Sequence, residues 1–102
     1  MKRLLTLLLF FNTMLLLLQA QPMHQIKGTV IDKNSRQPLE FINVMIIGLN
    51  KGSVTNAEGR FTIEQVPPGI YRLQASAIGY KSVTTSEYIL STKNLNIPIE
   101  ME

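Results

Sequence analysis

The sequence predicts an all-β sandwich that follows a removable leader, and three observations lead to this prediction. From Gln25 to Met101 the apolar residues recur with the two-residue period of β-strands, and the helical period is absent. Turn-forming residues interrupt the pattern about every 8 to 12 residues, a spacing typical of a β-sandwich. The chain has 102 residues, which is enough for a single domain. We therefore expect about seven short strands around one core.

The first 20 residues are predicted to be a signal peptide. Lys2 and Arg3 form a positively charged start, and an apolar run from Leu4 to Leu18 follows it. A transmembrane anchor is the alternative. Roughly fifteen helical residues extend only about 22 Å, however, which is short of the ~30 Å hydrocarbon core of a bilayer. We expect cleavage after Ala20 and export of the remaining chain, with a linker at residues 21–24 and the sandwich domain at residues 25–102.

Composition excludes several classes of function. The chain has ten Lys and Arg residues against seven Asp and Glu residues, and two of the cations lie in the leader, which leaves eight against seven. Such a nearly neutral domain has no basic stripe for nucleic acid. The absence of cysteine excludes a disulfide framework, a thiolate metal site, a cysteine nucleophile and a cysteine-linked lipid anchor.

The first two strands are predicted on either side of a long turn. Apolar residues alternate with polar ones from Ile26 to Val30, and the turn-rich stretch Asp32–Pro38 ends this strand. The second strand, Phe41–Ile47, is apolar on both faces apart from Asn43. A strand of this kind is central in its sheet or covered by a neighbour.

A hairpin is predicted next. The short strand Ser53–Thr55 leads into the loop Asn56–Gly59, and the strand Arg60–Glu64 follows with Phe61 and Ile63 pointing inward. Asparagine initiates turns well, and glycine readily adopts the positive φ that closes them. We expect Gly59 to need that conformation, so that a substitution there is costly.

The remaining elements are two strands and a weaker one between them. After the proline-containing break Val66–Gly69, where we also expect Gly69 to have positive φ, the strand Tyr71–Ala77 alternates clearly. The turn Ile78–Tyr80 and a weak strand at Lys81–Thr85 follow, and Leu95–Met101 alternates to the end. The proline at position 98 falls on the polar side of this last strand, which predicts an edge strand able to accept a strand from a partner.

No catalytic, cofactor-binding or metal-binding residue is expected. His24, the only histidine, precedes the first strand and is interpreted as a solvated linker residue. The acidic residues fall in turns or at outward positions, with no pair placed for glycoside hydrolysis. They are Asp32, Glu40, Glu58, Glu64, Glu87, Glu100 and Glu102.

Two further patterns favour a structural role over ligand binding. Asp32–Ser35 is faintly similar to the start of a calcium loop, but Lys33 and Arg36 would place positive charge in the site. Tyr71 and Tyr80 could stack on a ligand, but burial against the core is the favoured interpretation.

Five short motifs, in order and at normal spacing, carry a family resemblance over about Gln25 to Met101. They are Ile26-x-Gly28-x-Val30-x-Asp32, Pro38-Leu39 with Ile42-x-Val44-x-Ile46-x-Gly48, Gly52-x-x-Thr55-Asn56-x-x-Gly59-x-Phe61-x-Ile63, Pro68-Gly69-x-Tyr71-x-Leu73, and Ile78-Gly79-Tyr80. Together they resemble the carboxypeptidase-regulatory-like domain, a transthyretin-like seven-stranded sandwich. The sequence departs from the family at Asn56, where aspartate is frequent, and at Phe41-Ile42, where a small residue is frequent.

The resemblance implies a non-catalytic role without a cofactor. Directly behind a signal peptide, such a domain resembles the periplasmic N-terminal extension of a TonB-dependent outer-membrane receptor, which implies a protein partner or the remainder of the receptor. No nucleic acid and no small-molecule substrate are expected. Because the chain holds neither plug nor barrel, we expect it to be an N-terminal fragment. The alternatives are a free-standing exported module that binds carbohydrate or a surface, and an accessory lobe of a zinc carboxypeptidase, which needs a separate catalytic domain.

Overall fold

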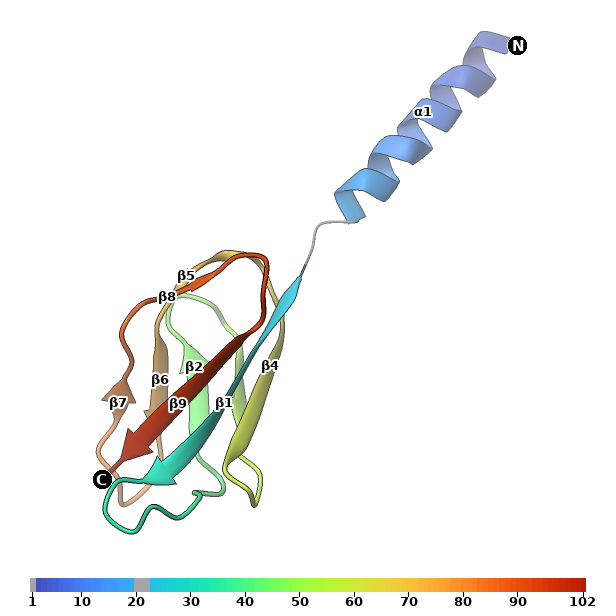
Figure 1. Cartoon of the computed structure of the whole chain (residues 1–102). Coiled ribbons are helices and arrows are strands. Elements are labelled where there is room, and N and C mark those ends of the chain that lie inside the picture. Colours follow the sequence, from blue (N-terminus) through green and yellow to red (C-terminus); the bar gives the residue numbers. More distant parts are fainter. Residues whose placement is uncertain (1, 20–22) are drawn as a thin grey trace.

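The computed structural model describes residues 2–19 and 23–102, which form one helix and nine strands (Figure 1). The predicted cleavage after Ala20 and the first half of the predicted linker, residues 21 and 22, lie outside the described residues. The elements are α1 (Lys2–Gln19), β1 (His24–Asp32), β2 (Asn43–Ile46), β3 (Gly52–Val54), β4 (Arg60–Val66), β5 (Gly69–Tyr71), β6 (Leu73–Ser76), β7 (Val83–Thr84), β8 (Tyr88–Leu90) and β9 (Leu95–Met101).

The apolar run of the predicted leader forms helix α1. Its leucines and phenylalanines between positions 4 and 11 are all more than half exposed. Within the described ranges, none of the helical structure combines the length and the apolar character that a bilayer crossing requires. From residue 23 onward the chain consists of strands and turns, as the two-residue period predicts.

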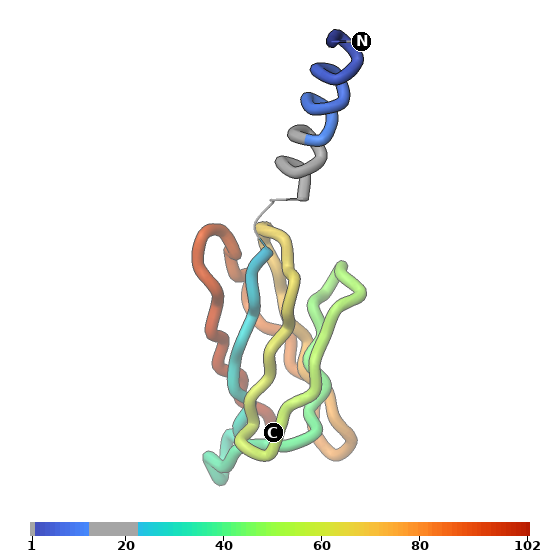
Figure 2. Tube along the Cα trace, turned by 90° about the vertical axis from the view of Figure 1, so that its right-hand side faces the viewer, coloured from blue at the N-terminus to red at the C-terminus, as the bar shows by residue number. Residues whose placement is uncertain are grey.

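Two sheets make the body of the sandwich. One has the strand order β4-β1-β9 and the other has the order β3-β2-β6-β7, while β5 and β8 form a separate pair. Strand β1 runs antiparallel to β4 and parallel to β9, from Ile26 opposite Leu95 to Asp32 opposite Met101. Figure 2 shows β1 and β4 side by side in one layer. The predicted edge position of the last strand is confirmed.

The core lies between the two larger sheets and is built by strict alternation along the strands. In β4 and β9 nearly every second residue is buried and those between are exposed. The fully buried apolar residues are Ile26, Val30, Ile42, Val44, Ile46, Phe61, Ile63, Val66, Leu73, Ala75, Leu90, Ile97, Ile99 and Met101. Most of them come from the two larger sheets, Leu90 comes from β8, and together they form one cluster, as the sequence predicts for a single core.

Two predicted strands differ from the observed ones, and one observed strand has no counterpart in the sequence prediction. The expected strand Tyr71–Ala77 is divided at Arg72, because β5 and β6 belong to different sheets. Strand β8 was not predicted, and it pairs with β5. The second strand begins at Asn43 rather than at Phe41, whose backbone has a φ of 62° and leaves the strand conformation.

Two residues predicted to lie in irregular segments are part of strands. His24 begins β1 opposite Val66 and is half-buried, rather than being a linker residue. Gly69 begins β5 opposite Leu90 and does not have positive φ, so the predicted turn conformation is wrong there. Gly59, by contrast, has a φ of 71°, as expected.

Candidate functional site

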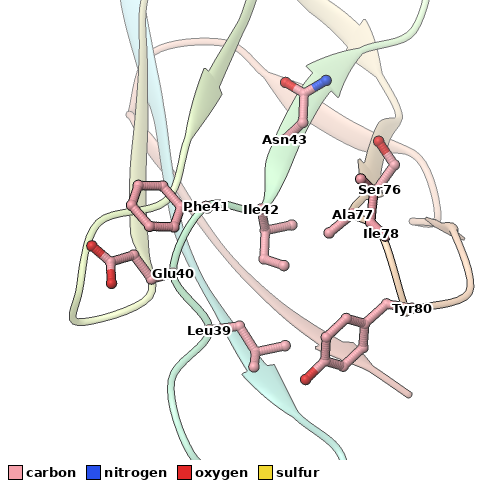
Figure 3. A pocket seen from close by; sticks show the side chains of 9 residues that line it. All are labelled: Leu39, Glu40, Phe41, Ile42, Asn43, Ser76, Ala77, Ile78 and Tyr80. Carbon is pink, nitrogen blue, oxygen red and sulfur yellow. The ribbon is translucent and has the colours of Figure 1, made fainter.

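An apolar groove opens at the end of the β2–β6 pair (Figure 3). It has a volume of about 660 Å³ and is lined by residues 39–43, 76–78 and 80. The side chains of Leu39, Ile42, Ala77 and Tyr80 converge in its interior. Glu40 and Phe41 line the groove at the loop that forms one rim, and their side chains project away from this interior.

The groove exists because β2 and β6 separate beyond Asn43. The last pair of the ladder is Asn43 with Ser76, and the same register would place Phe41 opposite Ile78. The Phe41 N–H instead donates to the Thr55 carbonyl at 3.1 Å. Within the described part of the chain, the backbone N–H and C=O of Ile78 have no hydrogen-bond partner.

Phe41 combines an unfavourable backbone with an exposed side chain. A positive φ is rare for residues other than glycine and asparagine, because Cβ approaches the backbone carbonyl. Phe41 is 74% exposed, so burial of the side chain does not compensate for this cost. Ile78, across the opened ladder, is fully exposed as well.

Thr55 holds the loop in this conformation. It is the one buried polar residue among those described, with 2% exposure. Its hydroxyl donates to the Leu39 carbonyl at 2.6 Å and accepts the Ile42 N–H at 2.9 Å. Its backbone N–H donates to the Ile42 carbonyl at 3.0 Å. Both ends of the Phe41 corner are therefore fixed by a single residue of the hairpin that follows β3.

Tyr80 forms the opposite wall of the groove and is anchored by Asp32. Its hydroxyl donates to Asp32 Oδ2 at 3.2 Å, while Oδ1 accepts the N–H groups of Asn34 and Ser35. The two backbone hydrogen bonds hold the pKa of Asp32 below its usual value, with a smaller contribution from Tyr80. Burial, and then the Asp32 carboxylate, raise the pKa of Tyr80. The segment with a faint calcium-loop pattern is thus a turn that closes on Asp32.

The other candidate residues of the sequence take ordinary structural positions. Tyr71 and Tyr80 pack against the core, as favoured, and the Tyr71 hydroxyl donates to the Pro67 carbonyl at 2.6 Å. The acidic residues are exposed, apart from half-buried Asp32. Among these acids only Glu40 lines the groove. In the described ranges, no three His, Cys, Asp or Glu residues gather closely enough to hold a metal ion.

The free edge of β9 is a poorer docking surface than its position suggests. The Met101 carbonyl accepts the Lys33 N–H, so Met101 faces β1. Because successive residues of a strand direct their backbone groups to opposite sides, Pro98 faces the free edge, where its missing N–H leaves a gap. The Lys81 N–H also donates to the Glu102 carbonyl at 2.9 Å just beyond this edge.

Comparison with known proteins identifies the fold and the family. Residues 26–102 match the CarboxypepD_reg-like domain. The chain belongs to this family. No curated protein matches the chain in sequence. The resemblance to carboxypeptidase-regulatory-like domains is thereby confirmed, and members of this family are non-catalytic domains.

Solved structures similar to this CarboxypepD_reg-like domain share its architecture at low identity. Two are chains of type II cohesin–X-dockerin complexes from Acetivibrio cellulolyticus, a C-terminal and an N-terminal interface mutant, with TM-scores of 0.68 and 0.65 and identities of 20% and 19%. Each alignment covers 76% of this chain and 56% of that chain.

The third is the 5-hydroxyisourate hydrolase of Klebsiella pneumoniae, a transthyretin-like fold, with a TM-score of 0.58 and 18% identity over 76% of this chain and 89% of that one. These likenesses confirm the predicted all-β, transthyretin-like sandwich. At this level of identity they show the fold alone.

Proposed function

We propose that this chain is a non-catalytic, exported interaction domain that forms the periplasmic N-terminal part of a TonB-dependent outer-membrane receptor. The observation that carries the interaction role is the apolar groove, whose exposed Phe41 is held in a costly conformation by buried Thr55. Membership of the CarboxypepD_reg-like family supports a role through contacts rather than chemistry. The positive start and apolar helix of the leader support export.

The placement of the only histidine supports the non-catalytic assignment. His24 begins β1, whereas the groove lies beyond the other end of that strand, where Asp32 contacts Tyr80. Eight residues of extended chain separate the two by roughly 26 Å. The hydrolase among the structural neighbours shares 18% identity with this chain. An identity this low carries no information about the activity of this chain.

The alternative is a free-standing exported module that binds carbohydrate or a surface. Such modules present rows of exposed aromatic rings for stacking. Among residues 23–102, Phe41 is the exposed aromatic side chain, and the tyrosines are half-buried against the core. A single ring favours a protein contact over a sugar-binding platform.

The test is the natural gene expressed in its own host. We expect the reading frame to continue after Glu102 into a plug and a barrel, and the protein to fractionate with the outer membrane with its leader removed near Ala20. Amino-terminal sequencing and separation of the two membranes measure this. An uncleaved leader, or a frame that continues into a catalytic domain, would contradict the proposal.

A further inference from the structure

The groove beside Phe41 specifies its occupant more closely than the proposed function does. We infer that it binds an extended segment of a partner protein, with an apolar side chain inserted between the loop and Tyr80, and a basic side chain placed at Glu40. This inference rests on the proposed interaction role and names the surface and the chemistry of the partner.

An extended occupant is favoured by the backbone at the mouth of the groove. The β2–β6 ladder ends at Asn43 and Ser76, the terminal residues of the two strands, and the chain beyond this pair is unpaired across the groove. The N–H and C=O of Ile78 are left without a partner in the described part of the chain. An extended segment supplies backbone donors and acceptors at regular intervals, as in the addition of a strand to an open sheet.

An apolar anchor is favoured by the groove interior. Leu39, Ile42, Ala77 and Tyr80 converge there, with polar Asn43 and Ser76 at the end nearest the ladder. Contacts of this kind, a buried apolar anchor surrounded by a rim, account for most of the binding energy at protein interfaces. Phe41 and Ile78, both exposed, would be covered by the same segment.

A basic neighbour is favoured by the charge of the rim. Glu40 is the only charged residue among those that line the groove. Its carboxylate is exposed and forms no ion pair with any cation in the described ranges. A lysine or arginine beside the apolar anchor would pair with it and orient the segment, whereas an acidic residue would be repelled.

The unfavourable backbone of Phe41 supports a binding role for this loop independently of the residues that line the groove. Positive φ is unfavourable at a bulky residue, and strain of this kind gathers at functional sites. Thr55 fixes the corner before any partner arrives, so the segment would bind to a surface that is already formed.

Peptide binding to the full-length chain tests the chemistry of the occupant. Three fluorescent peptides with a strand-forming Thr and Ser background are compared by anisotropy. The first carries leucine and lysine two positions apart, the second replaces the lysine by glutamate, and the third replaces the leucine by serine. We expect the first to bind, the second to bind about fivefold more weakly and the third about tenfold more weakly. Equal affinity for all three would overturn the inference.

Variants of the chain locate the binding. Phe41→Asn and Ile78→Asn should each weaken the leucine–lysine peptide about tenfold, and Glu40→Lys should reverse the preference toward the glutamate peptide. Ile89→Asn is the matched control, because Ile89 is 69% exposed on β8 and does not line the groove. Circular dichroism of each variant confirms folding. Binding that Ile89→Asn weakens as much as Phe41→Asn does would place the peptide elsewhere.

Continuation of the chain into a receptor tests the proposed function, and the peptide measurements test this inference separately. If the reading frame continues into a plug and a barrel while the groove variants bind the leucine–lysine peptide as tightly as the native chain, the groove inference is wrong and the proposed function stands. If the frame does not continue into a receptor, the proposed function fails, and the peptide measurements still decide the inference. A second copy of the chain as the occupant would appear as concentration-dependent dimerisation that Phe41→Asn abolishes, and this also would overturn the inference.

Discussion

The Asn56–Gly59 hairpin and the Leu39–Ile42 loop meet at the same buried threonine. They differ in how well the residue with positive φ suits that backbone conformation. At the hairpin, Asn56 Oδ1 accepts the N–H groups of Glu58 and Arg60, and the residue with positive φ is a glycine. At the loop, the residue with positive φ is a phenylalanine whose ring is exposed.

The difference distinguishes a residue that the backbone conformation requires, Gly59, from a residue that the backbone disfavours and the surface displays, Phe41. A Cβ atom at Gly59 would lie 2.5 Å from the Val30 carbonyl oxygen, so glycine is required twice, by conformation and by space. At Phe41 the positive φ is unfavourable for the residue type, and the side chain is not buried. Local agreement with the fold is the rule in natural sequences, and a residue that breaks it is expected at a functional position.

The largest expected effect is at the hairpin. Gly59→Val should destabilise the domain by about 3 kcal/mol or more, because a β-branched residue at positive φ would also collide with the Val30 carbonyl. The midpoint of urea denaturation measures the loss. Gly48→Val is the control, since Gly48 also has positive φ but has open space around it, and it should lose less. Equal losses would mean that the close approach to Val30 is unimportant.

The next effect is at the shared threonine. Thr55→Val removes the hydroxyl that serves the Leu39 carbonyl and the Ile42 N–H, and it should cost about 2 kcal/mol. Thr55→Ser keeps the hydroxyl and should cost about half as much. Hydrogen exchange should show the Ile42 amide losing protection in the valine variant. Unchanged protection would show that the backbone bonds of Thr55 hold the loop without the hydroxyl.

Substitution by asparagine should change stability in opposite directions at the two corners, Phe41 and Gly59. Phe41→Asn should stabilise the domain by about 1 kcal/mol, because asparagine tolerates positive φ and little buried surface is lost. Gly59→Asn should destabilise it, because its Cβ still meets the Val30 carbonyl. Thermal denaturation of both variants measures this. A destabilised Phe41→Asn would show that the ring contributes to the fold.

The smallest expected effect concerns the wall of the groove. The pKa of Asp32 is lowered in the folded state, so its ionised form stabilises the fold above the unfolded pKa, and this contribution is lost as pH falls through the folded value. The difference in stability between the native chain and Asp32→Asn should therefore be present at pH 7 and shrink below pH ~4. A difference that is independent of pH would mean that the Asp32 charge does not matter.

The sequence predicts most of the sandwich because alternation and turn residues are local signals. The edge position of Leu95–Met101, the hairpin at Gly59 and the inward residues of β4 all follow from them. Strand β8 and the division at Arg72 could not be predicted, because they depend on which distant segment each strand pairs with. The sequence pattern places His24 in the linker for the same reason, since its strand position depends on pairing with Val66.

The sequence gives one signal for the position of the groove and none for its other residues. Phe41-Ile42 stood out as bulkier than the family pattern, and this was the available signal for the site. Its positive φ arises from hydrogen bonds to Thr55, which lies more than a dozen residues away in the chain. Glu40 was grouped with solvated acids, which is correct for its exposure, but its place on the rim depends on the packing of Tyr80.

The parallel pairing of β1 and β9 has a mechanical consequence. The domain begins with β1 and ends with β9, so its first and last strand residues lie at opposite ends of the sandwich (Figure 1). A pulling force between them acts along both strands in opposite directions and loads the whole ladder from Ile26–Leu95 to Asp32–Met101 at once. The hydrogen bonds would have to yield together in shear rather than open one at a time. We therefore expect the domain to resist unfolding when it is pulled along the β1–β9 direction.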